Sequence, residues 1–487
     1  MLPSVDRRAF LLGAGALSVA AGCDRVLSFA AELFGDAIPE RFAAPATVDL
    51  DPDWHLLSRT SFGPRPGDLD LVRSMGRAAF LDWQLSPEAI DDTACEIRTA
   101  GIDSPHLPAS LLFELPPDQI EEELARYTLL QAVYCRRQLH EVLVEFWSDH
   151  FHVAIGKSLC AHLTPFDYRT VARRHALGRF RDLLGASALS PAMLVYLDGT
   201  ANQAATPRGP GANENYAREL LELHTLGVHG GYTQADIMNA ARCLTGFVVR
   251  ESWAPGEVEF VPERHDDGEK VVLGQRIPAG GGRGDVERLL DIVAEHPSTA
   301  RHVSEKLARA FIAEEPPRAI VDCAAQTFLA TSGDLRATVR VILSSNEFEE
   351  ARGTLFKRPF RFMASALRAL GADTHAKERL VAWLGRMGQA PFAWPTPDGY
   401  PTRRERWLGT LMTRFSLASA LGRNDLEGTR LDLDRLRAAV VGSDKTVALA
   451  AHLFGRAPTA RERDALTGRS PDNALGLALA SPGFQVY

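Results

Sequence analysis

The chain has 487 residues, of which 45% are hydrophobic and 24% charged, and its formal net charge is −8. This balance is typical of a folded globular protein, and the length allows roughly two to four structural units. The acidic net charge excludes the broad basic surface that nucleic-acid binding requires, so no nucleic-acid partner is expected.

Residues 1–22 have the pattern of an export signal. Arg7 and Arg8 precede an uncharged apolar run too short to span a bilayer, and the pair resembles a twin-arginine signal. The small residues that follow, ending at Cys23, resemble a lipoprotein processing site, which predicts Cys23 as the lipidated residue. Asp24 is similar to an inner-membrane retention signal and indicates the periplasmic face of that membrane. An ordinary cleaved signal or an uncleaved anchor is the alternative.

Residues 23–50 are expected to form a tether, because they hold two prolines and only one short helical stretch. Residues 51–370 are predicted to form a helical core. Apolar residues recur there at three-to-four spacing, most clearly over 118–147 and 165–184, as in amphipathic helices. Residues 371–487 are expected to form a C-terminal helical region packed on this core.

The pattern changes at about 247–275, where three short segments favour strands. The segments at 258–261 and 270–273 flank Asp267-Gly268, which is a hairpin signal. The predicted fold class is therefore mostly α, a multi-helical globular protein with one small β-hairpin insertion.

Cysteine usage argues against a thiolate zinc site and a disulfide framework. No pair forms a C-x-x-C motif, and lipidation of the first cysteine would leave an odd number of thiols. The six cysteines are Cys23, Cys95, Cys135, Cys160, Cys243 and Cys323.

The densest set of polar side chains lies between Asn213 and Phe247. Helical spacing puts Asn215, Glu219 and Glu222 on one face, whereas His224 falls on a more apolar side. Such a face is suited to binding a metal or to acid–base work, and equally to a buried ion-pair network between two helices. Both hypotheses remain open.

Two further ion-pair or capping roles belong to the same segment. Glu214 and Arg218 are four residues apart and are expected to form an ion pair. Asn213 or Asn215 can cap the start of the helix, and Arg242 lies on the following helix.

A metal site is a second hypothesis. His150 and His152 would share one face of a strand, and two imidazoles joined by a carboxylate suit a transition metal. Asp198 could supply an oxygen ligand, although a turn role is equally adequate. The pattern leaves the cofactor open, with a divalent metal ion as the candidate.

Two loops carry the remaining candidates. His265 and Asp266 adjoin the expected hairpin and could present an acid–base pair over a cleft. Trp394 and Tyr400 belong to an aromatic and proline-rich loop that either lines a groove or fills a gap between helices.

Ordered sequence blocks between about residues 53 and 421 resemble the bacterial domain-of-unknown-function 1800 family. They include Leu57–Pro64, Phe146–Phe151, Asn213–Phe247 and Asp398–Pro401, with Ala212 standing where the family usually has proline. The resemblance implies an exported, largely helical envelope protein, often encoded beside a sulfatase-like domain-of-unknown-function 1501 protein. It transfers no catalytic residue.

The leading hypothesis is a lipid-anchored envelope protein with a polar pocket that hydrolyses an envelope or extracellular polymer, with a metal-dependent reaction as one form of it. The expected catalytic residues are Glu219, Glu222, His265 and Asp266. The expected substrate-binding residues are Arg218, Arg242, Asn213, Asn215, Trp394 and Tyr400. The expected metal ligands are His150, His152, Asp198 and His224. The alternative is a non-catalytic scaffold or assembly partner of the sulfatase-like protein.

Overall fold

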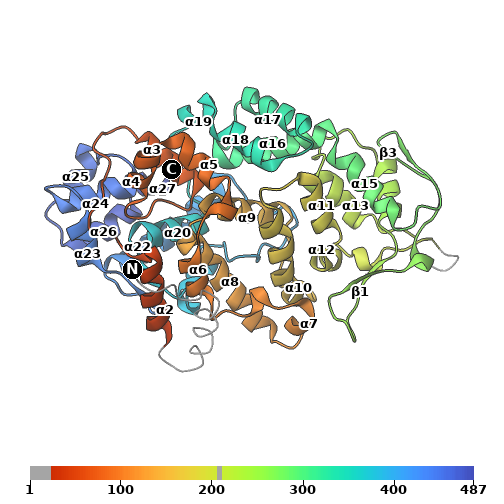
Figure 1. The fold of residues 1–487 in the computed structure, drawn as a ribbon, viewed down its shortest axis with the longest axis horizontal. Helices are drawn as coiled ribbons and strands as arrows, with labels where there is room; N and C mark the ends of the chain where they lie inside the picture. The colour runs from red at the N-terminus through yellow and green to blue at the C-terminus, as the bar shows by residue number, and fades with distance from the viewer. Residues whose placement is uncertain (1–22, 206–210) are drawn as a thin grey trace.

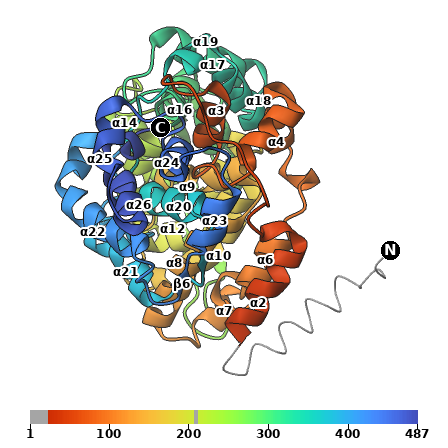
Figure 2. The same cartoon turned by 90° about the vertical axis from the view of Figure 1, so that its left-hand side faces the viewer.

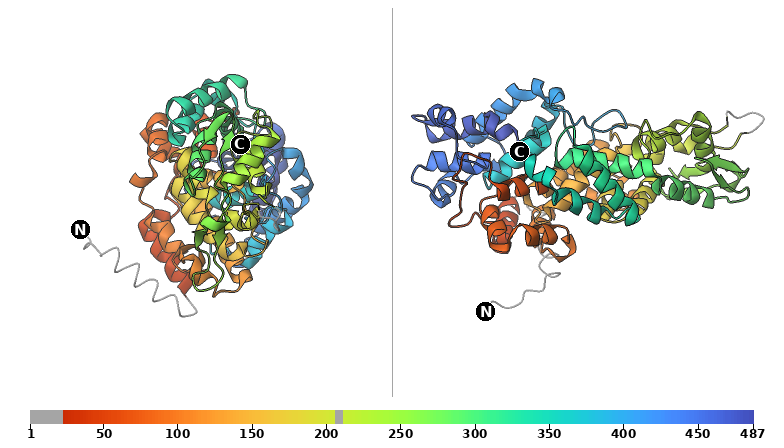
Figure 3. Two further views of the ribbon diagram at one scale, coloured as in Figure 1. Left: turned by 90° about the vertical axis from the view of Figure 1, so that its right-hand side faces the viewer. Right: turned by 90° about the horizontal axis from the view of Figure 1, so that it is seen from above.

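The computed structural model describes residues 23–205 and 211–487, so the predicted signal lies outside the described residues. Within them the prediction of a mostly α fold is confirmed: helices dominate, and the strands form three small antiparallel pairs. The molecule is elongated. Its first and last helices gather at one end and two hairpins lie at the other (Figures 1 and 3). None of the described helices combines the length and apolar character needed to cross a bilayer.

The first half of the chain consists of short helices around two longer ones, α8 and α9. Their bounds are α2 (Cys23–Ala31), η1 (Glu32–Asp36), α3 (Pro52–Thr60), α4 (Asp68–Met75), α5 (Arg77–Gln84), α6 (Thr93–Thr99), α7 (Ala109–Leu112), α8 (Pro117–Tyr134), α9 (Gln138–His150), α10 (Cys160–Asp167), η4 (Tyr168–Arg173), α11 (Phe180–Ala188), α12 (Pro191–Tyr196), α13 (Asn215–Glu219), η6 (Leu220–His224) and α14 (Gln234–Cys243).

After the hairpins the chain returns to helices up to its C-terminus. Their bounds are α15 (Gly284–Ala294), α16 (Pro297–Phe311), α17 (Arg318–Ala330), α18 (Leu335–Leu343), α19 (Asn346–Glu350), α20 (Pro359–Ala369), α21 (Glu378–Arg386), η8 (Arg404–Thr410), α22 (Leu411–Gly422), α23 (Leu433–Ala439), α24 (Lys445–Phe454), α25 (Ala460–Leu466), α26 (Pro471–Ala480) and α27 (Pro482–Gln485). A short pair, β5 (Asp373–Thr374) and β6 (Thr429–Arg430), joins two of their connections.

Local signals set the ends of several helices. The Asp51 carboxylate accepts hydrogen bonds from the first amides of α3, at 2.8 and 3.1 Å. Thr233 and Asp236 form a reciprocal capping box at the start of α14. Helix α4 ends at Gly76, whose φ of +81° is a conformation that a glycine adopts at little cost.

The β insertion differs from the predicted hairpin. Strand β2 (Val258–Phe260) pairs with β1 (Phe247–Val249), and β3 (Lys270–Val272) pairs with β4 (Gln275–Ile277). The expected pairing of the second and third strands across Asp267-Gly268 is therefore wrong.

The physical reason is the turn that the chain uses instead. Leu273 and Gly274 form the two-residue turn of the second hairpin with φ of +50° and +76°. A leucine rarely adopts positive φ, so no sequence signal marks this turn. Its amide donates to the Asp236 carboxylate at 2.7 Å, a tertiary contact that supports the strained residue.

One continuous hydrophobic core runs from Ile38 to Tyr487, so the helices after residue 370 share it with those before. A second, smaller cluster joins α2 to α6. The segment 23–50, expected as a tether, thus begins with a helix packed on the body. The five cysteines from Cys95 onward are free thiols, and all but Cys323 are buried.

Candidate functional site

Helix α9, near the middle of the molecule (Figure 1), presents three carboxylates on one side. Glu141, Glu145 and Asp149 follow at intervals of four residues and therefore share a helix face. Two cavities of about 50 and 120 Å³ adjoin this face. Glu145, Asp149 and Tyr400 line both cavities, so the end of α9 is their common wall.

Arg358 neutralises two of these carboxylates. It precedes α20 and donates to Glu145 at 2.8 Å and to Asp149 at 2.6 Å. Burial acts to lower the pKa of Arg358, but the two carboxylates outweigh it and raise that pKa. Burial raises the pKa of Glu145, and Arg358 opposes the shift. The three groups form a partly buried charge cluster with one more acid than base.

The smaller cavity is more apolar and contains a separate ion pair. Arg173 donates to both oxygens of Glu141, at 2.6 and 2.7 Å. Burial acts to raise the pKa of Glu141, but the adjacent guanidinium holds that pKa well below its usual range. Phe360 and Phe392 line the same cavity, and the buried Ser148 hydroxyl has no hydrogen-bond partner among the described residues.

His150 is the last residue of α9 and lines the larger cavity. Its Nε2 lies 3.0 Å from the backbone oxygen of His224, which can only accept a hydrogen bond. Nε2 therefore carries the proton, and the buried Nδ1 keeps a lone pair with no partner among the described residues. Burial, reinforced by the charge of Lys306, moves the pKa of His150 well below its ordinary value. The ring is neutral at physiological pH.

Two more histidines stand behind His150. The rings of His224 and His302 have centroids 6.2 and 6.3 Å from that of His150. Burial lowers the pKa of His224 to about 3 and that of His302 to about 4, and the Lys306 charge adds to both shifts. All three imidazoles are neutral, and the charge of Lys306 acts on each of them.

Lys306 projects from α16 into the wall of the larger cavity. Its side chain is only partly exposed, and it makes no hydrogen bond or ion pair within residues 23–205 and 211–487. Burial lowers the pKa of Lys306 to about 8, while the carboxylates of Asp149 and Asp398 oppose the shift. An amine with this pKa exists in both protonation states near neutral pH.

The other wall of the larger cavity is a loop that approaches the end of α9 closely. Gly399 has a φ of +73°, and a Cβ at this position would lie 2.2 Å from the backbone oxygen of Asp149. Only glycine allows this contact. Asp398, exposed at the cavity mouth, accepts a hydrogen bond from Thr396 at 2.5 Å.

Aromatic residues of the same loop fix it against the segment after α9. The Nε2 of His152 lies 2.7 Å from the backbone oxygen of Trp394, whose indole donates to Asp398 at 3.3 Å. The Tyr400 hydroxyl donates to the backbone oxygen of Ala390 at 2.5 Å. Tyr400 thus separates the two cavities, whereas Trp394 orients the acid at the mouth.

The predicted cluster around Arg218 is an ion-pair network near the surface. Arg218 donates to Glu214 at 2.9 Å and to Glu222 at 3.4 Å, which confirms the expected pair with Glu214. The π-helical turn η6 begins directly after Glu219 and changes the side-chain spacing. Glu222 reaches Arg218 at the i,i+4 spacing of an ordinary helix, and His224 is buried as expected.

Asn213, Asn215 and Asp198 mainly stabilise the backbone at the start of α13 through hydrogen bonds and an ion pair. Asn213 accepts from the amide of Asn215 at 3.0 Å, and the Asn215 amide group donates to Asp198 at 3.2 Å. Asp198 also pairs with Lys157 at 3.0 Å. Glu219 is different: burial first, then the charge of the nearby Glu222, raises its pKa, and Asp398 adds to the shift.

The predicted acid–base pair of the hairpin region belongs to another network. Arg242 binds both oxygens of Asp266, at 2.7 and 2.9 Å. The Nε2 of His265 lies 3.2 Å from Asp285, which also pairs with the buried Lys270. These residues are matched with one another, and none of them lines either cavity beside α9.

The four predicted metal ligands do not converge. His150 ends a helix rather than lying on a strand with His152, and the two rings contact different backbone oxygens. His224 is behind His150, and Asp198 is paired with a lysine. Within the described ranges no three His, Cys, Asp or Glu side chains come together in a group that could hold a metal ion.

Sequence reasoning missed Lys306, Arg358 and Asp398 as site residues. The two acids of α9 carried a readable signal, their spacing of four on one helix, within a block already noted. Lys306 lies on a strongly amphipathic helix, where a lysine ordinarily faces solvent. No pattern in the chain indicates that this one faces a cavity.

Fold and site together define a helical protein with a small charged cavity at the end of a central helix. The chain belongs to the family described as protein of unknown function (DUF1800), whose model matches residues 55–486. No curated protein and no solved structure matches the chain.

Proposed function

We propose that this protein is an exported, lipid-anchored envelope protein and that the larger cavity beside α9 is an acid–base site for hydrolysis of an envelope or extracellular polymer. The observation that carries the catalytic part is Lys306, an amine without an ion-pair partner among the described residues, at a cavity wall shared with the neutral imidazole of His150. The pattern of residues 1–22 and Cys23 supports export, a lipid anchor and a periplasmic location at the inner membrane.

The residues present suit a one-base mechanism. The neutral fraction of Lys306 takes a proton from a water molecule in the cavity. That water attacks the electrophilic carbon of the substrate, and the bond to the leaving oxygen breaks. The Lys306 ammonium returns its proton to that oxygen, so the amine is regenerated. Asp398, at the mouth of the cavity, positions a polar group of the substrate polymer.

The size of the cavity sets what can enter. About 120 Å³ holds roughly four water molecules at their liquid volume. Only the group being cleaved and its water fit inside, so the rest of a polymer would lie along the mouth near Glu219 and Trp394.

Activity on isolated cell-envelope polymers tests the catalytic proposal. Purified protein is incubated with peptidoglycan and with exopolysaccharide, and new reducing ends and amines are measured. Lys306→Met is expected to lose about a hundredfold or more of the rate, whereas Lys377→Met, at an exposed position, keeps it. A Lys306→Met protein as active as the wild type would refute the proposed role.

Metabolic labelling with a palmitate analogue tests the anchor. The label is expected on the wild-type chain and absent from Cys23→Ser, because the thioether can form only at the cysteine. Equal labelling of both proteins would exclude Cys23 as the lipid site.

A scaffold for a secreted sulfatase-like partner is the second candidate, and one surface favours it. Leu408, Leu411, Met412 and Phe415 follow at helical spacing and are 41–75% exposed, which forms an apolar ridge. Co-purification with the co-expressed partner should survive Lys306→Met and be lost in Met412→Asp. No polymer cleavage together with this result would favour the scaffold.

A further inference from the structure

Helix α2 has an inner apolar face that holds it on the body. Leu27, Ala30 and Ala31 are buried and pack with Ala94 and Ile97 of α6. The two helices lie side by side at the edge of the molecule in Figure 2. This inner face explains how α2 is attached to the body. It does not explain the residues on the opposite side of the helix.

The outer face of α2 is apolar as well, although nothing in the described chain covers it. Val26 and Phe29 of α2, and Leu33 of η1, which continues α2, are 55, 64 and 70% exposed. Their spacing of three and four residues places them in one stripe, with Arg25 and Glu32 beside it. A soluble helix of this length ordinarily keeps one side polar, so a stripe of three large exposed side chains indicates a partner.

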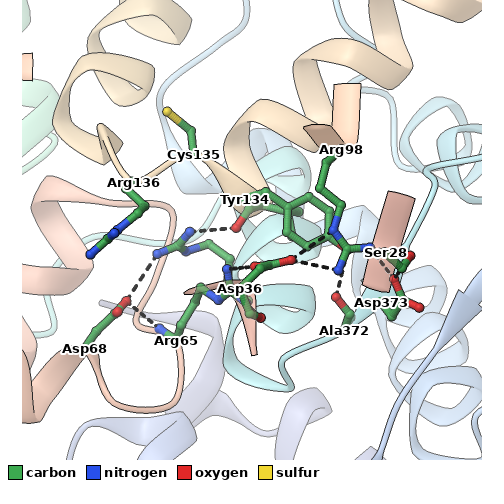
Figure 4. A network of polar contacts seen from close by, with 12 residues as sticks. Ser28, Asp36, Arg65, Asp68, Arg98, Tyr134, Cys135, Arg136, Ala372 and Asp373 are labelled. Carbon is green, nitrogen blue, oxygen red and sulfur yellow. Dashed lines mark hydrogen bonds and ion pairs between the residues drawn. The ribbon is translucent and has the colours of Figure 1, made fainter. Parts of the chain in front are cut away.

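Polar contacts fix the orientation of α2, so that its outer apolar face cannot rotate toward the body. The Ser28 hydroxyl donates to Asp373 at 2.7 Å and accepts from Arg98 at 2.7 Å, as Figure 4 shows. Arg98 also pairs with Asp36, the last residue of η1, which in turn pairs with Arg65. These buried contacts fix the segment at Ser28 and at Asp36, so its outer face has a set direction relative to the body.

The sequence before α2 points to the identity of the partner. Residues 9–22 are uncharged and mostly apolar, and Cys23 is the first residue of the helix. At 1.5 Å per residue, Leu33 lies within about 15 Å of Cys23 along the axis. An anchor at Cys23 therefore keeps the whole outer face within about 15 Å of the membrane surface.

We propose that α2 and the first turn of η1 form a membrane-surface helix whose outer face, Val26, Phe29 and Leu33, inserts at the boundary between headgroups and acyl chains. This inference rests on the membrane anchor of the proposed function and goes beyond it. The body is then held against the bilayer in one orientation, because α2 is fixed to α6 and does not act as a flexible tether. Arg25, at the side of the stripe, is placed to meet lipid phosphates.

Quenching by lipid tests this orientation in the full-length protein. Cys323→Ser removes the exposed thiol, and an environment-sensitive fluorophore is attached at Phe29→Cys or, as the matched control, at Val271→Cys on strand β3. Val271 is an exposed apolar residue at the opposite end of the molecule. Each protein is reconstituted in vesicles of phosphatidylethanolamine and phosphatidylglycerol that contain lipids spin-labelled on the acyl chain.

Spin-labelled lipid is expected to remove roughly half of the emission at position 29, a depth of about 5–10 Å, and almost none at position 271. Equal quenching at the two positions, or none at either, overturns the proposal. Quenching at position 29 in a protein that takes up no palmitate at Cys23 supports the helix and refutes the lipid anchor. A blue shift at position 29 without vesicles that grows with protein concentration indicates a second copy as the partner, and also overturns it.

Discussion

Replacing Lys306 by methionine should stabilise the protein at neutral pH. The pKa of Lys306 falls from 10.5 in the unfolded chain to about 8 in the folded one, mainly through burial. At about 1.4 kcal/mol per pKa unit, keeping this side chain charged lowers the free energy of unfolding by about 3 kcal/mol. Methionine has a similar volume and no charge, so Lys306→Met should recover about 2 to 3 kcal/mol.

The stability that Lys306→Met gains should depend on pH, because the gain comes from removing a group that titrates. The unfolded chain binds the lysine proton more tightly, so wild-type stability rises with pH between about 8 and 10.5. Lys306→Met lacks this rise, and its advantage is full below pH 8 and fades above it. Urea unfolding followed by tryptophan fluorescence measures both proteins across this range, with Lys377→Met as control.

Two results would refute the argument. One is a Lys306→Met protein that is less stable than the wild type at pH 7, since the lysine would then be making favourable contacts. The other is a stability difference that stays constant from pH 7 to 10.5, since the folded and unfolded pKa values of Lys306 would then be equal.

Three further substitutions test the surroundings of the cavities. Arg358→Met leaves the two partly buried carboxylates of α9 without their ion-pair partner and should cost about 3–5 kcal/mol in urea unfolding, whereas a loss below about 1 kcal/mol would contradict the ion-pair cluster. Gly399→Ala forces a Cβ into a backbone oxygen and should lower Tm by several degrees, while Gly409→Ala, with open space at its Cβ, should not. Glu141→Gln should destabilise the protein by about 3 kcal/mol at pH 7. Because the pKa of Glu141 is lowered in the folded state, this difference should persist above pH 4.5 and shrink below it; a difference independent of pH would contradict the lowered pKa.

The helical class and many helix ends were readable from the sequence because they depend on neighbouring residues. The Asp51 cap, the Thr233 capping box and the stop at Gly76 each act within a few positions. Amphipathic spacing works in the same way, since it reports one face of one element. The ion pair of Glu214 and Arg218 is also local, one helical turn apart.

The hairpins show where local reasoning ends. Asp267-Gly268 has the composition of a hairpin turn, yet the chain turns at Leu273-Gly274 instead. The difference comes from Asp236, distant in sequence, which bonds the Leu273 amide.

The sequence by itself determined the class of the fold, the family and the signal pattern that predicts export and a lipid anchor. The tertiary structure decided which polar residues share a cavity. His150, Lys306, Arg358 and Asp398 come from segments up to 248 positions apart and meet only because α9, α16, α20 and one loop pack together. The tertiary structure also gave different surroundings to polar residues that look alike in the sequence. Arg242 and His265 lie beside charged partners, whereas Lys306 lines a cavity. Charge pairing between distant segments depends on packing geometry, and single-chain spacing does not encode it.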